Sequence, residues 1–564
     1  MKKRYTAMIA AMTLMYVLAG CGGKSDSAKE TTAEVKSTEA VKSEADEVNE
    51  ATEELGELIK DNEKEAKLLH AKIISDGKYG SVDNGEYSVN YNTTTAGVIL
   101  NDEEAEEYPL LAKALNDEFE EKKRMSEKDF EDLRDSAASI LEYGGSGDYM
   151  QLIAENSASV VRADETVLSY LIDYTDFYGG AHGNYASLGR SFDTETGKKL
   201  SIYDVISDKE TFSKALEAEL TKRYADDGGL IENNTPAQAV ETFFEYISSE
   251  DSSDSVSWTI GNDRLNIYFN PYSIASYAFG EADISLMFSE YPGVVKDIYT
   301  DNASDSYAVK IKGYDGYLAD INNSGEYVNV AANYGTYDEF CYESLDIVVT
   351  DDNGQSTTKS CDAHYFDFYT YYVKIGYRHY LHIFASSEND FTGDYIYEIT
   401  GGDIKDCGYY GVCPARISYE YTEDGDIWMN SETTAAYSDP AKLQLSVRLD
   451  ALSTYNAWRY YSINALGIPE SDELYRITAD YVSPKLKKGI TAAIADANGK
   501  KTGEKVDIPA GTALHFYMTD GESFVIFSLD DGRYIVVDFD SSDWPYTVEG
   551  EPMDEVLEDY VFAG

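Results

Sequence analysis

The sequence predicts a multidomain protein in which an α+β module, with helices packed on an antiparallel sheet, is followed by mostly-β domains. Its 564 residues are enough for three or four domains at ~150 residues each. Hydrophobic residues make up 43% and aromatic residues 13%, which provides for large cores and excludes a wholly disordered chain. Helical periodicity is concentrated before residue 300, and strand-like runs separated by turns dominate after it.

The charge balance narrows the classes of partner. Lys and Arg number 46 and Asp and Glu 104, for a formal net charge of −58. Phosphates would be repelled along most of such a surface, so we expect no nucleic-acid partner. The same charge disfavours electrostatic adhesion to anionic lipid. No catalytic motif set is found, and we expect no cofactor and no metal site.

Residues 1–20 have the features of an export signal. Three cationic residues follow the initial Met and precede an uncharged, mostly apolar run that is too short for a mature membrane anchor. The run ends in Leu18-Ala19-Gly20-Cys21, which resembles the lipobox of bacterial lipoproteins. This resemblance implies that Cys21 is lipidated and becomes the new N-terminus. We therefore expect a chain anchored to the cell membrane by lipid alone and facing the extracytoplasmic side.

Two segments are expected to separate the anchor from the folded part. Residues 21–50 are rich in Lys, Ser, Glu, Thr and Ala and lack aromatic residues, so they predict a disordered tether. Residues 51–84 begin with Leu55, Leu58 and Ile59 at helical spacing, and we predict a helical stalk over this range.

Residues 85–300 alternate helix-like and strand-like stretches. Apolar stripes predict amphipathic helices, and a capping box with Pro at the first helical position opens another at Thr235-Pro236-Ala237-Gln238. The stripes consist of Leu111, Leu115 and Phe119, then Phe130, Leu133, Ala137 and Leu141, and later Phe212, Leu216 and Leu220. Alternation from Leu168 to Tyr174 and the run from Arg264 to Phe269 predict strands. This mixture favours helices packed on an antiparallel sheet.

Two segments of this module resemble a known family. DETVLSYLIDYTDFYGGAHGNY (Asp164 to Tyr185) and YFNPY (Tyr268 to Tyr272) are similar to the extracellular module of RsiV-type anti-sigma factors, which also occurs in PdaC-type peptidoglycan deacetylases. In RsiV the module is a receptor for lysozyme, a basic protein that an acidic surface would attract. The sequence shows neither the membrane helix of an anti-sigma factor nor the catalytic motifs of a deacetylase, so neither of those activities is expected.

The glycine-rich loop is the candidate ligand site. It comprises Gly179, Gly180, His182, Gly183 and Tyr185. Glycines let a ligand approach the backbone closely, and His182 would then contact it. The alternative is a tight structural loop whose histidine caps backbone carbonyls.

Residues 301–485 predict a β-rich domain, either a sandwich or a propeller-like stack of sheets. Four cysteines lie here, Cys341, Cys361, Cys407 and Cys413. Because we expect the protein to be exported, this even number predicts disulfide bonds. Three pairings are allowed. We favour Cys341–Cys361, which flank the turn at 351–354, and Cys407–Cys413. A zinc site is disfavoured because no CxxC spacing occurs.

Residues 486–564 differ from the preceding domain in their pattern, which predicts short strands joined by tight turns. This pattern resembles an SH3-like barrel of the kind found in bacterial wall-associated modules. We expect Val556, Tyr560 and Phe562 to cap it.

The resulting functional prediction is a cell-surface lipoprotein that binds or senses an extracellular ligand, such as lysozyme or wall glycan. Two alternatives remain open. One is an envelope hydrolase acting on peptidoglycan or polysaccharide, which would need a pair of carboxylates facing one cleft. The other is a structural or adhesive display protein.

Overall fold

The computed structural model describes residues 66–143, 151–224, 230, 235–249, 255–313, 316–351, 353–387, 392–478 and 482–562. The predicted signal peptide, Cys21, the tether and residues 51–65 of the stalk lie outside this part. From Glu65 to Gly564 the chain forms one compact unit. None of the described helices combines the length and apolar character needed to cross a membrane.

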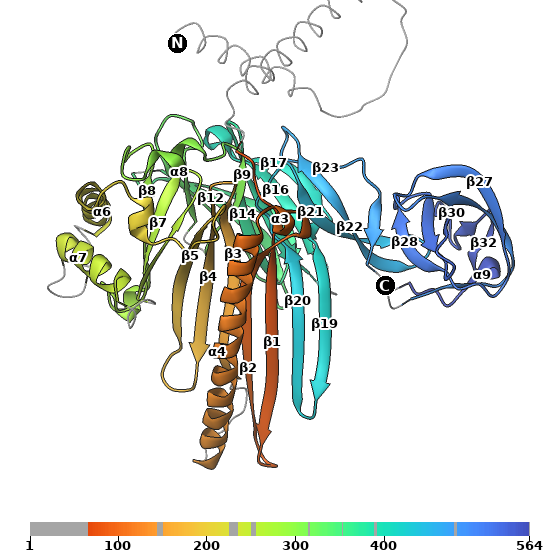
Figure 1. Cartoon of the computed structure of the whole chain (residues 1–564), viewed down its shortest axis with the longest axis horizontal. Helices are drawn as coiled ribbons and strands as arrows, with labels where there is room; N and C mark the ends of the chain where they lie inside the picture. Colours follow the sequence, from red (N-terminus) through yellow and green to blue (C-terminus); the bar gives the residue numbers. More distant parts are fainter. Residues whose placement is uncertain are drawn as a thin grey trace, which may run out of the picture. The chain divides into compact units, whose positions relative to one another are not determined.

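A seven-stranded sheet forms the first layer (Figure 1). Its order is β19 (Arg416–Asp424), β20 (Ile427–Ala435), β1 (Ala71–Asp83), β2 (Ser88–Leu100), β3 (Gln151–Ala163), β4 (Val167–Phe177) and β5 (Asn184–Asp193). All neighbours are antiparallel except β2 and β3, which run parallel. The crossover between those two strands carries helix α4 (Pro109–Glu142), as a parallel connection requires.

The prediction of a helical stalk over 51–84 is wrong where it can be checked, because residues 71–83 form strand β1. Gly77 and Gly80 disfavour a helix here, and β1 is paired along its length by β2 and along much of it by β20. The second partner lies in the predicted β-rich domain. The sheet therefore crosses the domain boundary predicted near residue 300.

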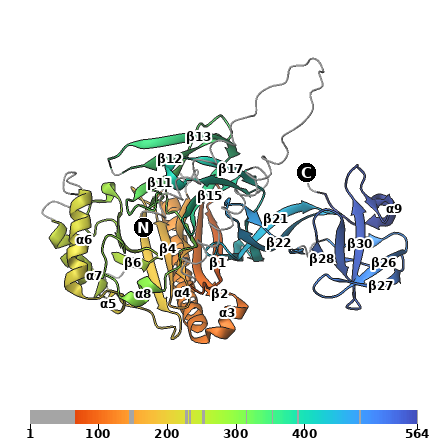
Figure 2. The same cartoon turned by 90° about the horizontal axis from the view of Figure 1, so that it is seen from above.

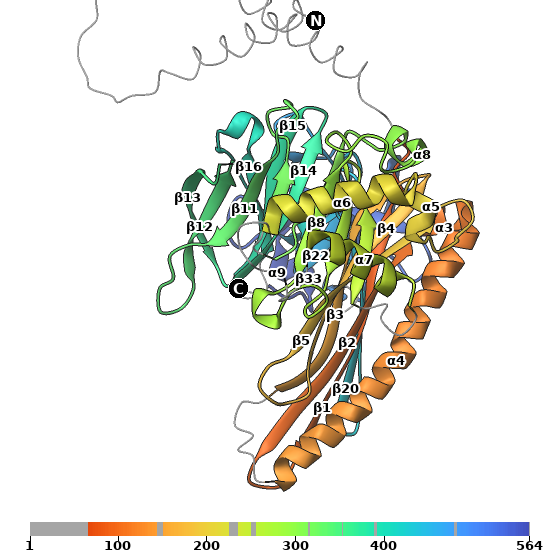
Figure 3. The same ribbon diagram turned by 90° about the vertical axis from the view of Figure 1, so that its left-hand side faces the viewer.

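Helix α4 covers one face of this sheet (Figure 3). The two predicted stripes form a single 34-residue helix, preceded by the short α3 (Asp102–Glu107). The buried side chains of α4 are Leu111, Leu115, Phe119, Phe130, Leu133 and Ala137, which confirms the predicted apolar face.

A smaller α+β layer follows. Strands β6 (Val256–Ile260), β7 (Arg264–Phe269) and β8 (Ala282–Met287) form an antiparallel sheet. It shares a core with the short α5 (Ile202–Val205), α6 (Lys209–Tyr224), α7 (Pro236–Ile247) and α8 (Asp297–Asp301). The predicted capping box at Thr235 and Gln238 is confirmed. The α+β character of this part is therefore as predicted.

Two further sheets lie against one another (Figure 2). One has the order β10 (Tyr317–Ala319), β11 (Val328–Tyr334), β12 (Tyr342–Thr350) and β13 (Ser356–Tyr365). The other has the order β17 (Lys405–Tyr410), β16 (Thr392–Glu398), β15 (Arg378–Ser386), β14 (Asp367–Ile375) and β9 (Tyr307–Lys310). Residues of both sheets form one hydrophobic core, so this region is mostly β, as predicted.

The C-terminal strands belong to a larger sheet and do not close into a barrel. Its main path is β18 (Cys413–Pro414), β21 (Leu443–Asp450), β22 (Thr454–Ile463), β24 (Tyr475–Ile477), β28 (His515–Thr519), β29 (Phe524–Ser528), β30 (Tyr534–Asp540), β26 (Ile490–Ala495) and β27 (Lys501–Ile508). The short strands β23 (Pro469–Glu470), β31 (Thr547–Val548) and β32 (Glu551–Pro552) lie off this path, and β25 (Lys485–Leu486) pairs with β33 (Leu557–Glu558). This open path replaces the predicted SH3-like barrel, because β28 pairs with β24 and so joins the C-terminal strands to strands that precede residue 486. Val556, in α9 (Met553–Val556), is buried in the core, and Tyr560 and Phe562 pack against the same core, as expected of a cap.

The predicted disulfides are also corrected, since Cys341, Cys361, Cys407 and Cys413 form no disulfide in the structure. The expected hairpin between β12 and β13 is present, but its register places Cys361 opposite Leu345. Cys341 lies four residues before Leu345, which at ~3.3 Å per residue places its Cα about 13 Å along the strand from the position opposite Cys361. This exceeds the ~7 Å between Cα atoms that a disulfide can span. Cys407 and Cys413 belong to strands of different sheets.

Candidate functional site

The predicted glycine loop connects β4 to β5. Gly179 and Gly180 have φ of +93° and +119°, a conformation that side chains disfavour. Gly183 is constrained by space instead, since a Cβ there would lie 2.3 Å from the carbonyl oxygen of Asp176. All three positions therefore favour glycine for structural reasons, two through backbone conformation and one through lack of space.

Aromatic rings gather around this loop. The His182 ring stacks on Tyr277 with 4.0 Å between centroids, and Tyr185 and Tyr272 lie 5.7 and 5.6 Å from the same tyrosine. We call His182, Tyr185, Tyr272 and Tyr277 the aromatic rim. Tyr277 belongs to a 3₁₀ turn, η1 (Tyr277–Phe279). Apart from its aromatic side chain, nothing in the sequence pattern marks Tyr277 as part of this site.

The rim is both held in place and open to solvent. The Tyr277 hydroxyl donates a hydrogen bond to the carbonyl of Gly183 at 2.7 Å, which joins the two loops. Nδ1 of His182 lies 2.9 Å from the same carbonyl. This is the contact expected if the loop is structural and its histidine caps backbone carbonyls. His182 is nevertheless exposed, and the Tyr272 side chain is 58% exposed. The structure thus combines a fixed loop with an accessible aromatic surface.

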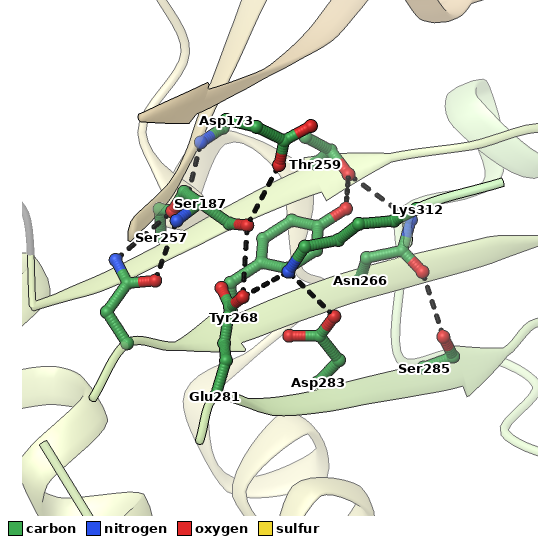
Figure 4. Close-up of polar contacts among 12 residues, drawn as sticks. Asp173, Ser187, Ser257, Thr259, Asn266, Tyr268, Glu281, Asp283, Ser285 and Lys312 are labelled. Atoms are coloured by element: carbon green, nitrogen blue, oxygen red, sulfur yellow. Dashed lines mark hydrogen bonds and ion pairs between the residues drawn. The ribbon is translucent and has the colours of Figure 1, made fainter. Parts of the chain in front are cut away.

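A partly buried polar group, the acid–lysine cluster, includes side chains of β4 and β5, the strands that flank the loop (Figure 4). It consists of Asp173 on β4, Ser187 on β5, Glu281 beside β8, Asp283 on β8 and Lys312. Lys312 Nζ contacts the Glu281 carboxylate and lies 3.0 Å from Asp283 Oδ2. The Ser187 hydroxyl lies 3.2 Å from both Asp173 Oδ1 and Glu281 Oε2, so it bridges the two carboxylates.

The cluster is connected to the rim through the backbone. The Asn270 side chain accepts a hydrogen bond from the Ser187 amide at 2.8 Å and donates one to its carbonyl at 3.2 Å. Asn270 is two residues from Tyr272, and Gly280 separates Glu281 from η1. The cluster is therefore linked to both loops that carry the rim. Sequence reasoning missed it, because its members come from four separate segments with no motif.

Burial governs the protonation of this cluster. Loss of solvent, reinforced by the Asp283 carboxylate and opposed by Lys312, raises the pKa of Glu281 to about 7. Burial lowers the pKa of Lys312, but the Asp283 and Glu281 carboxylates outweigh it and hold that pKa above its usual value. Only 9% of the Glu281 side chain is exposed, so this carboxyl is not presented as an open acid to a substrate.

We expect this proton to appear in the pH dependence of stability. Because the folded-state pKa of Glu281 is raised from 4.5 to about 7, its contribution is fully present below pH 4.5 and is lost as pH rises towards 7. Glu281→Gln stays uncharged, so it should match the wild type near pH 4.5 and exceed it by about 1 to 3 kcal/mol near pH 8.

Chemical unfolding across pH 4.5 to 8 measures this difference. The exposed Glu86→Gln is the matched control and should run parallel to the wild type. A Glu281→Gln curve that is also parallel would show that Glu281 ionises normally in the folded chain.

A second buried polar group lies away from the loop. His382 Nδ1 is 2.7 Å from Asp394 Oδ2 and 3.0 Å from the Tyr437 hydroxyl, and all three residues are buried. They connect β15, β16 and the segment after β20, which is a structural role. Within the described residues, no group of three or more His, Cys, Asp or Glu side chains is arranged to hold a metal ion.

Comparisons with known proteins locate one domain in the chain. No curated protein matches it. A solved structure of a DUF3298 family member from Bacteroides fragilis is 17% identical to this chain, with a TM-score of 0.31. The match covers 42% of this chain and 98% of the Bacteroides chain. A DUF3298 family protein from Pseudomonas aeruginosa is also 17% identical, with a TM-score of 0.28, and covers 41% and 96%. The model of the DUF3298 family, which is described as a protein of unknown function, matches residues 203–289. This range includes η1, Glu281 and Asp283 and forms a DUF3298 domain.

Proposed function

We propose that this chain is an extracytoplasmic binding protein whose aromatic rim docks a protein with a basic surface. The main support for this proposal is the pre-ordered cluster of rings at the connection between β4 and β5, in which His182 and Tyr272 are exposed. Tyrosines held in one conformation supply contact area at little entropic cost, and tyrosine is enriched among residues that dominate binding energy.

Charge and resemblance support the same partner class. The net charge of −58 would speed the approach of a basic protein. Residues 164–185, which include the loop, resemble the lysozyme receptor module of RsiV-type proteins. Lysozyme is therefore the probe of choice for this surface.

Binding by the full mature chain tests the proposal. We expect saturable binding of lysozyme that weakens as salt rises, because the screening length is about 8 Å at physiological ionic strength and shorter above it. Cytochrome c, another basic protein, serves as the control for charge alone. If both bind equally well, the chain attracts cations in general and the rim recognises nothing.

Membrane attachment is the second part of the proposal, with Cys21 as the lipidated residue. In a bacterial host that processes lipoproteins, a fatty-acid probe should label the wild type, and Cys21→Ser should lose both label and membrane association. Equal labelling of the variant would refute lipidation at Cys21.

The hydrolase alternative makes a different prediction. Glu281 and Asp283 are a close carboxylate pair, but Lys312 contacts both, and Glu281 is nearly enclosed. We therefore expect incubation with peptidoglycan to release no new reducing ends. Sustained release would favour the hydrolase over the binding protein.

A further inference from the structure

The seven-stranded sheet has a second face, opposite α4, that carries an open polar surface. Register places Tyr79 between Trp428 and Asn92, and Asn90 between Ser81 and Gln151. Directly paired residues lie on the same face of a sheet. The neighbouring Tyr91 points the other way, since its ring meets Phe130 of α4 at 4.9 Å.

This surface is hollowed into a groove of about 580 Å³, within the 300 to 1,000 Å³ of small-molecule sites. Its walls include Tyr79, Ser81, Asn90, Asn92, Gln151 and Trp428. Trp428 is 51% exposed, so one large ring is presented to whatever enters. Figure 1 shows the strands concerned, β20, β1, β2 and β3, side by side.

The amides of the groove are pre-ordered. Gln151 Nε2 donates to Asn92 Oδ1 at 2.6 Å, and Asn92 in turn donates to the Glu155 carboxylate. Asn92 is 1% exposed, so this chain of hydrogen bonds fixes a buried amide beneath the exposed Gln151 and Asn90. Side-chain amides both donate and accept hydrogen bonds, which suits ligands whose hydroxyl groups do the same.

Charge excludes other ligand classes. The ionisable lining includes the carboxylates of Asp83, Glu423 and Asp426, and no Lys, Arg or His is among the described residues that line the groove. An anion would be repelled. A simple cation would satisfy the carboxylates but would offer no acceptor to the exposed Asn90 amide, because ammonium groups only donate.

We propose that this groove binds a neutral oligosaccharide. The Trp428 ring would cover the apolar face of one sugar ring, while the amides and carboxylates would exchange hydrogen bonds with its hydroxyl groups. This site shares no residue with the aromatic rim and takes a different class of ligand. The proposal can therefore be tested independently of the function proposed above.

Titration of the full mature chain with chitotetraose, cellotetraose and maltotetraose tests the inference, with tryptophan fluorescence and calorimetry as readouts. We expect saturable binding of at least one sugar, little changed by salt. Trp428→Ala should weaken it at least tenfold, and Trp428→Phe less. Trp544→Ala, at another exposed tryptophan (67%), should leave it unchanged.

The exposed Asn90→Ala provides a second variant that does not disturb the core, and it too should weaken binding. Failure of all three sugars to saturate the chain would overturn the proposal, and so would binding that survives both groove substitutions. Tetralysine distinguishes the competing chemistry: binding of this peptide that needs Trp428, with no sugar binding, would identify a cation site instead.

Discussion

Asp164→Ala should be among the most destabilising substitutions in the described part of the chain, at about 3 to 5 kcal/mol. Arg162 and Asp164 are both fully buried and form an ion pair at 2.6 Å. Asp164 Oδ1 also accepts hydrogen bonds from the amides of Thr166 and Val167 at 2.8 and 3.0 Å. Removing the carboxylate leaves a buried guanidinium without its counter-charge and two amides without an acceptor.

The effect should be largest in β3 and β4, which flank the ion pair, and should extend to the end of β6 and to α8, because Arg162 also donates to the carbonyls of Gly261 and Tyr299. Amide hydrogen exchange of these strands measures the loss locally. The matched control is Asp132→Ala, which removes an exposed ion pair with Lys128 on α4 and should cost about 1 kcal/mol or less. Equal costs for the two variants would contradict a special role for the buried pair.

Gly189→Ala should separate β5 from β6. A Cβ at Gly189 would lie 1.9 Å from the carbonyl oxygen of Trp258, a distance at which backbone must move. The Gly189 amide also donates to Ser257 Oγ at 2.9 Å, and this serine donates to the Ser187 carbonyl at 2.7 Å. We expect a cost of about 1 to 3 kcal/mol or more.

Thermal unfolding compares this variant with Gly411→Ala, where a Cβ meets no atom within 4 Å and φ is not positive. The control should change stability by a few tenths of a kcal/mol at most, in keeping with an unconstrained surface position. A Gly189→Ala chain as stable as this control would mean that the two sheets are not in close contact.

Local patterns in the sequence predicted local structure well. The stripe of Leu111, Leu115 and Phe119 predicted a helix face because helical periodicity is set within a few residues. The capping box at Thr235 was predictable for the same reason. The glycine loop was predictable as a tight turn, and its neighbour Tyr185 does lie in the ring cluster.

Long-range pairing could not be predicted. Strand β1 pairs with the adjacent β2 and also with β20, whose residues lie far along the chain. The pairing of Cys341 with Cys361 failed because register depends on the whole hairpin, and it places Leu345 opposite Cys361. The acid–lysine cluster assembles from side chains on separate sheets, so neither its members nor the raised pKa of Glu281 leaves a trace in local sequence.

The most direct test of the proposed docking surface is the dissociation constant of lysozyme for the full chain carrying both His182→Ala and Tyr272→Asn. Asparagine suits position 272 because φ is +69° there and asparagine tolerates this conformation. Tyr337→Ala removes a tyrosine of similar exposure, 59% against 58%, from a loop outside the rim. We predict at least tenfold weaker binding for the rim variant and unchanged binding for Tyr337→Ala; equal affinity of all three chains would contradict the aromatic rim as the docking site.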